Sequence, residues 1–338
     1  NWLNNGESIL WASEKDGWRH LYNVSLSGKS EKTITNGDYD IIDLNHLDTK
    51  KGYVYFTASP ENATQKYLYR TKLNGKGKAE LLNPEDLKGT HNYSVSPTGA
   101  YAMHSFSNSY TRPAAEYVTF PKLKPINDSE SILGRINELQ ETPKVEFFKV
   151  TTVDNVEMDG WMVKPTNFDP SKKYPLVFYV YSEPARATVT DTYGVGRNYN
   201  YNGNMADDGY IYISLDNRGT PVPKGRQWRK SIYRNIGRIN IQDQAMAAKE
   251  IMKWDFVDSE RIAVWGHSGG GSATLNLMFK YPEIYKKNIN MTKIIPKGNR
   301  DMFPGDYLRY NYNLNEDSIV IDLGAYIGEF THNIYEKY

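Results

Sequence analysis

The sequence predicts a two-part fold in which a region of β-strands is followed by an α/β domain. Short alternating strands separated by turn residues fill residues 1–118, and nothing there has a sustained helical period. From Lys144 onward, apolar strands instead alternate with helices, which is typical of a parallel sheet covered on both faces. The length of 338 residues also exceeds the ~250 to 300 at which a single core usually stops growing, so two domains are expected.

A hairpin near the start of the chain recurs further along. The predicted strand at residues 8–12 leads into Asp16-Gly17, where glycine supplies the positive φ of a tight turn, and residues 18–22 form the returning strand. The returning strand recurs 47 positions later, with Leu21, Tyr22, Leu26, Gly28 and Lys29 matched by Leu68, Tyr69, Leu73, Gly75 and Lys76.

This repeat has the length of a propeller blade. Four-stranded units of ~40 to 50 residues stack on their neighbours to bury both faces. The second copy begins at residues 53–58, and a third, weaker copy runs through residues 94–103. Because a closed propeller needs at least ~4 blades, we predict a partial β-propeller of two or three late blades over residues 1–118, with earlier blades upstream. A β-sandwich of similar hairpins is the alternative.

Composition removes several classes of function. With 41 Lys and Arg against 40 Asp and Glu, the net charge of +1 gives no field to attract nucleic acid, and nucleic-acid binding is not expected. The longest apolar runs, at residues 176–181 and 262–265, are far shorter than the ~18 residues of a spanning helix, so no membrane-spanning segment is expected. The absence of cysteine excludes disulfides, thiolate nucleophiles and cysteine-ligated zinc, and leaves the compartment open.

The middle of the chain sets the domain limits. The strand pattern breaks after Pro113, and residues 129–139 are typical of a short helix, so residues 119–143 are predicted to form a linker. Because the chain starts at Asn1 and enters a strand pattern without a leader, we expect a fragment or a processed form. In the α/β domain, assigned to residues 144–290, strands are expected at 145–150, 176–181, 210–215 and 261–265, with helices at 242–253 and ending near 280.

A glycine-rich turn follows the last of these strands. Gly266-His267-Ser268-Gly269-Gly270 has the pattern G-x-S-x-G between a strand and a helix. Small residues are needed there because the sharp turn brings backbone segments together and holds the serine in a strained conformation with its hydroxyl exposed. Ser268 is therefore the predicted nucleophile, and the amide of Gly269 points to where an oxyanion would form.

The sequence provides no convincing general base. His267 adjoins the nucleophile, but neighbouring side chains on a tight turn diverge, so we expect it to be a packing residue. The remaining histidines are predicted to be strand or loop residues of the β region, except for one in the C-terminal tail; they are His20, His46, His91, His104 and His332.

Further motifs accompany this turn in a fixed order, namely Trp11–Tyr22, Lys173–Tyr181, Asp216–Thr220, Asp243-Gln244, Asp255–Asp258 and Tyr281–Tyr285. With the G-x-S-x-G turn, they resemble the dipeptidyl-peptidase IV branch of the prolyl oligopeptidase family over residues 1–287. The resemblance implies a β-propeller joined to an α/β-hydrolase domain. It further implies a serine peptidase that releases X-Pro or X-Ala dipeptides from peptide N-termini, with peptides as partners and no cofactor or metal.

The resemblance also implies roles for individual residues. Ser268 would attack the carbonyl after the second residue and form an acyl-enzyme that water hydrolyses. Tyr181 falls where the family places a tyrosine hydroxyl that joins the amide of Gly269 in the oxyanion hole. Without the resemblance, Tyr181 would be a core aromatic at the end of a strand. Family members often dimerise, so a homodimer in the periplasm or at the cell surface is the corresponding expectation.

The chain departs from the family pattern in three places. Gly269 stands where this branch often has a tyrosine that lines the proline pocket, so another side chain must form that wall. The paired glutamates that bind the substrate's free amine belong to earlier blades, upstream of Asn1. After Lys287 the sequence shifts, and neither the triad Asp nor the triad His can be assigned. The hydrolase domain is thus expected to be truncated and the chain as written to be inactive.

The tail at residues 291–338 follows a different pattern. Residues 318–321 are typical of a strand, and Asp322, Gly324 and Gly328 lie in a glycine-rich turn before a helix start. This resembles the opening of an FkbM-like, S-adenosylmethionine-dependent methyltransferase, with a Rossmann-like βα fragment but no complete methyl-donor site. A gene fusion or a sequence-assembly error would explain the junction. The alternatives are a divergent hydrolase whose last strands carry a glycine turn, and a non-catalytic propeller module that binds a partner.

Overall fold

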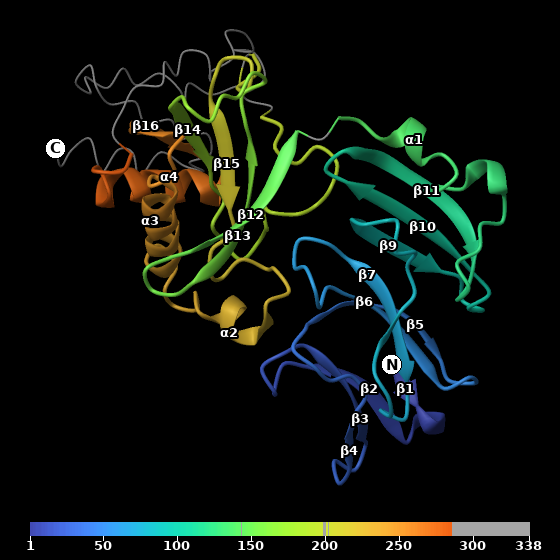
Figure 1. Cartoon of the computed structure of the whole chain (residues 1–338). Helices are drawn as coiled ribbons and strands as arrows, with labels where there is room; N and C mark the ends of the chain where they lie inside the picture. Colours follow the sequence, from blue (N-terminus) through green and yellow to red (C-terminus); the bar gives the residue numbers. More distant parts are fainter. Residues whose placement is uncertain (143, 199–200, 202, 286–338) are drawn as a thin grey trace, which may run out of the picture. The chain divides into compact units, whose positions relative to one another are not determined.

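The structure is a computed structural model that describes residues 1–142, 144–198, 201 and 203–285 (Figure 1). Its contacts divide the chain into two compact units. The N-terminal unit contains Asn1–Pro143 together with two later segments, Thr190–Val195 and Pro221–Lys230. The C-terminal unit contains Lys144–Val189, Gly196–Thr220 and the described residues from Ser231 onward.

Antiparallel sheets make up the described part of the N-terminal unit. The first two sheets have four strands each, and the third has three. The first sheet pairs β1 (Trp2–Leu3), β2 (Ser8–Ser13), β3 (His20–Ser25) and β4 (Glu31–Thr33) in that order, after a 3₁₀ turn at Asn4–Gly6 between β1 and β2. The second pairs β5 (Ile41–Asp48), β6 (Tyr53–Ala58), β7 (Tyr67–Lys72) and β8 (Glu80–Leu81). The third has the order β11 (Thr111–Thr119), β10 (Tyr101–Asn108), β9 (Thr90–Val95).

The predicted repeat is confirmed by equivalent strands and turns. β3 and β7 each take the third position in a four-stranded sheet, and each is followed by a glycine at positive φ, Gly28 at 68° and Gly75 at 65°. Gly17, in the predicted hairpin turn, has φ 104°. Glycine adopts this region without the steric cost that a Cβ brings.

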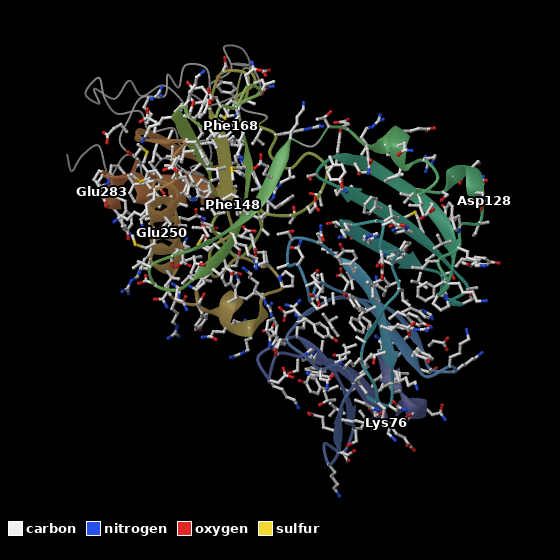
Figure 2. The ribbon with its side chains drawn as sticks, in the orientation of Figure 1. Lys76, Asp128, Phe148, Phe168, Glu250 and Glu283 are labelled. Atoms are coloured by element: carbon white, nitrogen blue, oxygen red, sulfur yellow. The ribbon has the colours of Figure 1, made fainter. Side chains whose placement is uncertain are left out.

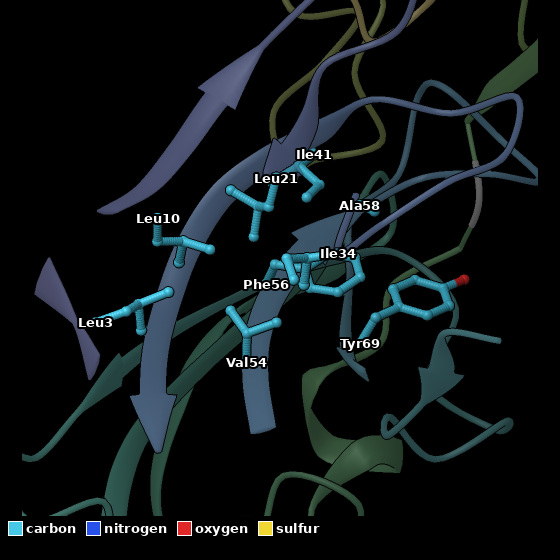
Figure 3. Packing of buried hydrophobic residues seen from close by; sticks show 9 residues of the cluster. All are labelled: Leu3, Leu10, Leu21, Ile34, Ile41, Val54, Phe56, Ala58 and Tyr69. Carbon is cyan, nitrogen blue, oxygen red and sulfur yellow. The ribbon is translucent and has the colours of Figure 1, made fainter. Parts of the chain in front are cut away.

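Neighbouring sheets bury their faces against each other, as blades must. One buried cluster joins Leu10 and Leu21 of the first sheet to Val54 and Phe56 of the second (Figure 3). A second cluster joins the second sheet to the third through Tyr55, Leu68, Tyr93, Ala102, Val118 and Phe120. The hydrophobic effect therefore acts between sheets as much as within them, which is consistent with part of a propeller.

The single helix expected at residues 129–139 is wrong. The structure has a 3₁₀ turn at Asp128–Glu130 and a four-residue helix α1 at Ile136–Leu139. Ser131 lies between them with extended backbone (φ −54°, ψ 127°), and the amide of the next residue, Ile132, donates to Glu116 Oε2 at 3.0 Å. This tertiary hydrogen bond replaces the helical one, so local propensity is overridden.

A buried ion pair fixes the later segment Pro221–Lys230 within the N-terminal unit. Helix α2 (Gly225–Lys230) presents Arg229 to the carboxylate of Asp40, which is 1% exposed. Asp40 also accepts hydrogen bonds from the amides of Arg19 and Gly225, both at 2.7 Å. Burial by itself raises the pKa of Asp40, but the hydrogen bonds from Arg229 and these amides outweigh it and hold that pKa below its usual range.

The C-terminal unit contains a five-stranded sheet with the order β12-β13-β15-β14-β16. Its strands are β12 (Val145–Thr151), β13 (Glu157–Val163), β14 (Tyr174–Tyr179), β15 (Ile211–Leu215) and β16 (Val257–Trp265), and its helices are α3 (Ile239–Ile251) and α4 (Gly269–Lys280). α3 and α4 pack against each other (Figure 1).

The sheet is mixed rather than wholly parallel as predicted. β14 pairs in parallel with both β15 and β16, whereas β12, β13 and β15 pair antiparallel. β12 and β13 are joined by a short hairpin, which permits only antiparallel pairing. Phe148 of β12, labelled in Figure 2, lies opposite Gly160 of β13. A Cβ added to Gly160 would lie 2.5 Å from the ring of Phe148, so only glycine fits there. On β14 the consecutive residues Leu176, Val177 and Phe178 are all buried, so both sheet faces are covered there.

Asp40→Ala is expected to destabilise the protein by about 3 to 5 kcal/mol, because it leaves the Arg229 guanidinium buried without its main partner. The free energy of unfolding, measured in urea, checks this. The double variant Asp40→Ala/Arg229→Met should recover part of the loss, since it also removes the guanidinium, which in Asp40→Ala keeps only its ion pair with Glu14 at 2.7 Å.

Lys149→Ala is the matched control, because Lys149 and Glu157 form an exposed ion pair (61% and 52% exposed side chains), and such pairs contribute at most ~1 kcal/mol. A loss in Asp40→Ala no larger than in this control would contradict the assignment.

Candidate active site

The predicted elbow lies between β16 and α4. Ser268 has φ 55° and ψ −121°, a conformation that residues other than glycine seldom adopt. Ser268 is also exposed to solvent. Such backbone strain costs roughly 1 to 3 kcal/mol and persists only where the surroundings enforce it. The turn therefore holds the Ser268 side chain at the surface of the C-terminal unit in a defined orientation.

Two glycines allow this turn to form. A Cβ on Gly266 or on Gly270 would overlap the carbonyl oxygen of Val180, the residue after β14. A Cβ added to Gly270 would also lie 3.2 Å from the Cα of Tyr181. The need for small residues on either side of the serine, predicted from the motif, thus has a direct cause in backbone contact.

The amide of Gly269 remains available as a donor. The next amides are used within the elbow, since Gly270 N–H donates to His267 O at 2.9 Å and Gly271 N–H donates to Ser268 O at 2.8 Å. Among the described residues, none accepts a hydrogen bond from Gly269 N–H. An amide without an acceptor at the N-terminus of a helix can donate a hydrogen bond to a developing negative charge and stabilise it.

The parallel pairing of β14 and β16 brings Tyr181 to the same edge. Tyr179 and Trp265 are register partners, and Val180 N–H donates to Trp265 O at 2.9 Å. β14 ends at Tyr179, two residues earlier than predicted, and Tyr181 is half-buried beyond it. The structure thus gathers Tyr181, Ser268 and Gly269 at the carboxyl ends of neighbouring strands, where ligands bind in open α/β sheets.

Sequence reasoning missed Glu183 at this edge. A Cβ on Gly269 would come within 2.6 Å of Glu183 Oε1 and would overlap the carboxyl carbon. The Glu183 side chain therefore fills the space beside the residue that follows the nucleophile. The one available signal was negative: Gly269 has no side chain, so another residue had to form that wall.

Hydrogen bonds join two of the motifs behind this edge. Arg218 and Asp243 form a bidentate ion pair, with Nη2 to Oδ1 at 2.6 Å and Nε to Oδ2 at 3.0 Å. Gln244 Nε2 donates to the carbonyl of Leu215 and to Asn217 Oδ1, at 2.9 and 3.0 Å. Charge-assisted bidentate pairs fix orientation as well as distance, so α3 is held against the end of β15.

Asp216, at the start of the first of these motifs, is buried. Its carboxylate accepts hydrogen bonds from the amides of Thr188 and Val189, both at 2.9 Å. Burial raises the pKa of Asp216 to about 6, although these hydrogen bonds lower it.

The surroundings of one histidine differ from the prediction. His267 is exposed, so the expectation that it is a packing residue is wrong. The outward-facing turn leaves its side chain without a core to enter. In the N-terminal unit, His20 bonds to Thr35 and to the carbonyl of Gly37, at 3.1 and 2.9 Å.

His91 and His104 are linked in a buried chain. His91 Nε2 donates to the carbonyl of Leu87 at 2.8 Å, His91 Nδ1 faces His104 Nε2 at 2.9 Å, and His104 Nδ1 faces Glu116 Oε1 at 2.8 Å. Burial and the neighbouring His104 lower the pKa of His91 to about 3. The ring nitrogens of His91 and His104 therefore hold neighbouring segments of the N-terminal unit together. Both residues lie in strands, in agreement with the prediction that they are strand or loop residues.

The methyltransferase-like tail lies outside the described residues, and so do Asp322, Gly324, Gly328 and His332. Within the described ranges, no group of three His, Asp or Glu side chains is arranged to hold a metal ion. In the same ranges, no helix has the length and apolar character to cross a membrane.

Comparison with known proteins gives matches in both units. Residues 1–113 match the family model of the dipeptidyl peptidase IV N-terminal region, and residues 199–293 match that of the prolyl oligopeptidase family. The dipeptidyl peptidase 4 of Trichophyton rubrum is 29% identical over 275 residues, which cover 80% of this chain and 35% of that protein. The dipeptidyl peptidase 4 of Arthroderma otae is 29% identical over 278 residues, covering 82% and 36%.

A solved structure agrees with these matches. The crystal structure of Porphyromonas gingivalis dipeptidyl peptidase 4 is similar with a TM-score of 0.71 and 28% identity, covering 84% of this chain and 39% of that one. A propeller region followed by an α/β-hydrolase domain is thus the fold that the neighbours share with this chain. The chain spans about a third of the length of the curated relatives it matches.

Gly270→Ala is expected to destabilise the protein by at least about 2 kcal/mol, because the added Cβ overlaps the backbone of Val180 and forced overpacking of a rigid contact is costly. Urea unfolding measures the change. Ser272→Ala, at an exposed position on the same helix, should be nearly neutral. Equal stability of the two variants would show that the elbow does not depend on this contact.

Asp216→Asn is expected to change the pH dependence of stability. Since the folded-state pKa of about 6 exceeds the ordinary value of 3.8, the stabilising contribution of Asp216 is fully present below pH ~4 and is lost as pH rises through about 6. The wild-type advantage over Asp216→Asn in free energy of unfolding should therefore shrink by about 2 kcal/mol between pH 4 and pH 7.

Asp258→Asn provides the opposite control. The hydrogen bond from Arg261 holds the pKa of Asp258 below its usual range, so the wild-type advantage over this variant should grow with pH. A constant difference between wild type and Asp216→Asn from pH 4 to pH 7 would rule out the raised pKa.

Proposed function

Because the chain belongs to the dipeptidyl-peptidase IV branch of the prolyl oligopeptidase family, we propose that it derives from a serine peptidase releasing X-Pro or X-Ala dipeptides from peptide N-termini. The observation that carries the proposal is Ser268 at φ 55° between β16 and α4. A strained, exposed serine at such a turn is the arrangement that nucleophilic acyl transfer requires.

The proposed oxyanion hole has two donors. The free amide of Gly269 supplies one, and the hydroxyl of Tyr181 supplies the other from the end of β14. Each donor of this kind contributes about 3 kcal/mol to the stabilisation of a tetrahedral intermediate. The close approach of the first turn of α4 to the chain after β14 supports the pairing, because a Cβ added to Gly270 would lie 3.2 Å from the Cα of Tyr181 and both donors therefore belong to the same edge.

We further propose that a polypeptide of the 338 printed residues hydrolyses no peptide. Neither the triad Asp nor the triad His is assigned among these residues. Without a base, a serine hydroxyl stays protonated, and loss of the triad His removes most of the catalysis. The peptide substrate, the homodimer and the periplasmic or cell-surface location are proposed for the peptidase from which the chain derives. A methyltransferase-like βα fragment is proposed for residues 291–338.

The 338-residue polypeptide is expected to show no more labelling by a fluorophosphonate probe than Ser268→Ala does, and no hydrolysis of a glycyl-prolyl reporter. Added imidazole, a soluble general base, should raise the labelling of wild type and leave Ser268→Ala unchanged. Labelling is measured by in-gel fluorescence.

Strong Ser268-dependent labelling without imidazole would overturn the proposed inactivity. No Ser268-dependent labelling with imidazole would count against Ser268 as a nucleophile. One uninterrupted DNA read across the codons for Phe256 to Tyr338 addresses the junction separately. A frame that continues beyond Lys287 with family-like sequence, including an Asp and a His, predicts an active peptidase.

A further inference from the structure

Three titratable side chains form a line across the third sheet of the N-terminal unit. His91 lies on β9, His104 on β10 and Glu116 on β11, and their exposed fractions are 0%, 3% and 8%. In the strand register, His104 lies directly opposite Glu116. Each of the four ring nitrogens and both carboxylate oxygens has a partner within 3.0 Å. We call these three residues the histidine cluster.

The contacts of the ring nitrogens fix the number of hydrogen atoms in the histidine cluster. The carbonyl of Leu87 can only accept, so His91 Nε2 carries one hydrogen. His91 Nδ1 is then an acceptor in the neutral ring, so His104 Nε2 carries a second. A third hydrogen is needed between His104 Nδ1 and Glu116 Oε1, since Glu116 Oε2 accepts from the amide of Ile132. Two neutral imidazoles carry only two hydrogens, so the cluster holds one proton more than they do.

Any other number of protons is unfavourable in this geometry. With two protons, one contact of 2.8 or 2.9 Å joins two lone pairs, and the buried carboxylate leaves a net negative charge. With four protons, two hydrogens share one contact and the net charge is positive. Uncompensated charge and unsatisfied polar atoms both destabilise a buried site. Burial and His104 accordingly lower the pKa of His91 to about 3, which excludes a fourth proton until the solution is strongly acidic.

The third hydrogen belongs to His104. Burial alone raises the pKa of Glu116, but the hydrogen bonds from His104 and from the amide of Ile132 outweigh it and hold that pKa below its usual range. The Arg135 guanidinium acts in the same direction and stays charged at every pH considered. The cluster is therefore a buried pair of imidazolium and carboxylate, extended by the neutral ring of His91.

The tyrosines that face the histidine cluster keep their protonation state. The ring of Tyr93 stacks on His104 at 4.6 Å, and the ring of Tyr67 lies 5.4 Å from that of His91. Burial raises the pKa of both tyrosines, so both hydroxyls stay protonated up to at least about pH 10. A change of pH between about 5 and 8 therefore acts on this site through the two histidines.

We propose that the histidine cluster is a pH-sensitive lock of the N-terminal unit, in which His104 stays charged up to about pH 8 and the cluster stabilises the fold most near pH 6.5. In an unfolded chain an imidazole has a pKa of about 6.5, so two histidines carry four ring hydrogens in acid and two in base. The folded cluster keeps three. Folding therefore releases a proton below about pH 6.5 and takes one up above it, and the stability that the cluster contributes falls on both sides of this pH. The lock does not depend on the proposed function, because Ser268 belongs to the C-terminal unit.

Glu116→Gln tests the lock with little change of shape. The amide nitrogen of the new side chain can donate to His104 Nδ1, and its oxygen can accept from Ile132, so the third hydrogen is supplied at every pH. The folded variant then holds one titrating proton fewer than wild type. The ratio of the folding constants of wild type and variant, measured by urea unfolding, is expected to fall tenfold per pH unit, about 30-fold from pH 6.5 to pH 8.

Glu80→Gln is the matched control, because Glu80 forms an ion pair with Arg70 on the second sheet and its side chain is 55% exposed. A carboxylate in such a place is ionised in the folded and the unfolded chain above pH 6. The ratio of folding constants of wild type and this variant should stay constant from pH 6.5 to pH 8. A constant ratio for Glu116→Gln as well would overturn the proposal.

The NMR spectrum of wild type tests the same claim without a variant. With ¹⁵N-labelled histidine at pH 7.5, hydrogens are expected on both ring nitrogens of His104 and on Nε2 alone of His91. Acidification to pH 5 should leave both rings unchanged. A single ring hydrogen on His104 at pH 7.5, or a second one on His91 at pH 5, would contradict the lock.

Discussion

The carbonyl oxygen of Val180 is the point on which the candidate site depends. The turn after β16 and the first residues of α4 both approach this oxygen so closely that Gly266 and Gly270 admit no Cβ. The parallel register of β14 and β16 sets the approach, because it places Tyr179 opposite Trp265 and the ends of both strands at one edge. Once these backbones are in contact, Ser268 has no room for a relaxed conformation.

Polar contacts from α3 hold the segment that follows β14. Asn240 Nδ2 donates to the carbonyl of Ser182 at 3.1 Å, which anchors a residue that is also at positive φ. Asn240 belongs to α3, and the Arg218–Asp243 pair and Gln244 position that helix. Two strained residues, Ser182 and Ser268, are thus maintained by neighbouring helices. The hydrogen bonds explain physically why charged motifs occur in the interior of an α/β domain.

Sequence periodicity predicted the strands and the elbow well because their signals are local. The repeat from Leu21-Tyr22 to Leu68-Tyr69 predicts equivalent strands, and these strands take the same position in two sheets. The glycines of the elbow predict a close approach of backbone segments, and the structure shows it at Val180. The failures lie where tertiary contacts decide. The helix at 129–139 is broken because Ile132 N–H bonds to Glu116, a residue on another strand. The mixed sheet arises from the hairpin of β12 and β13, which alternation alone does not orient.

Glu183 lay beyond the reach of sequence patterns for a similar reason. Its importance comes from the space it shares with position 269, which is 86 positions away in the chain and becomes adjacent only when β14 and β16 pair. A bulky residue at 269 and an extended acidic side chain at 183 cannot both keep their places without one of them moving. The absence of a side chain at 269 and the presence of a carboxylate at 183 are therefore coupled features of one wall. The chemistry of that wall is set by the pair, so neither residue can be interpreted alone.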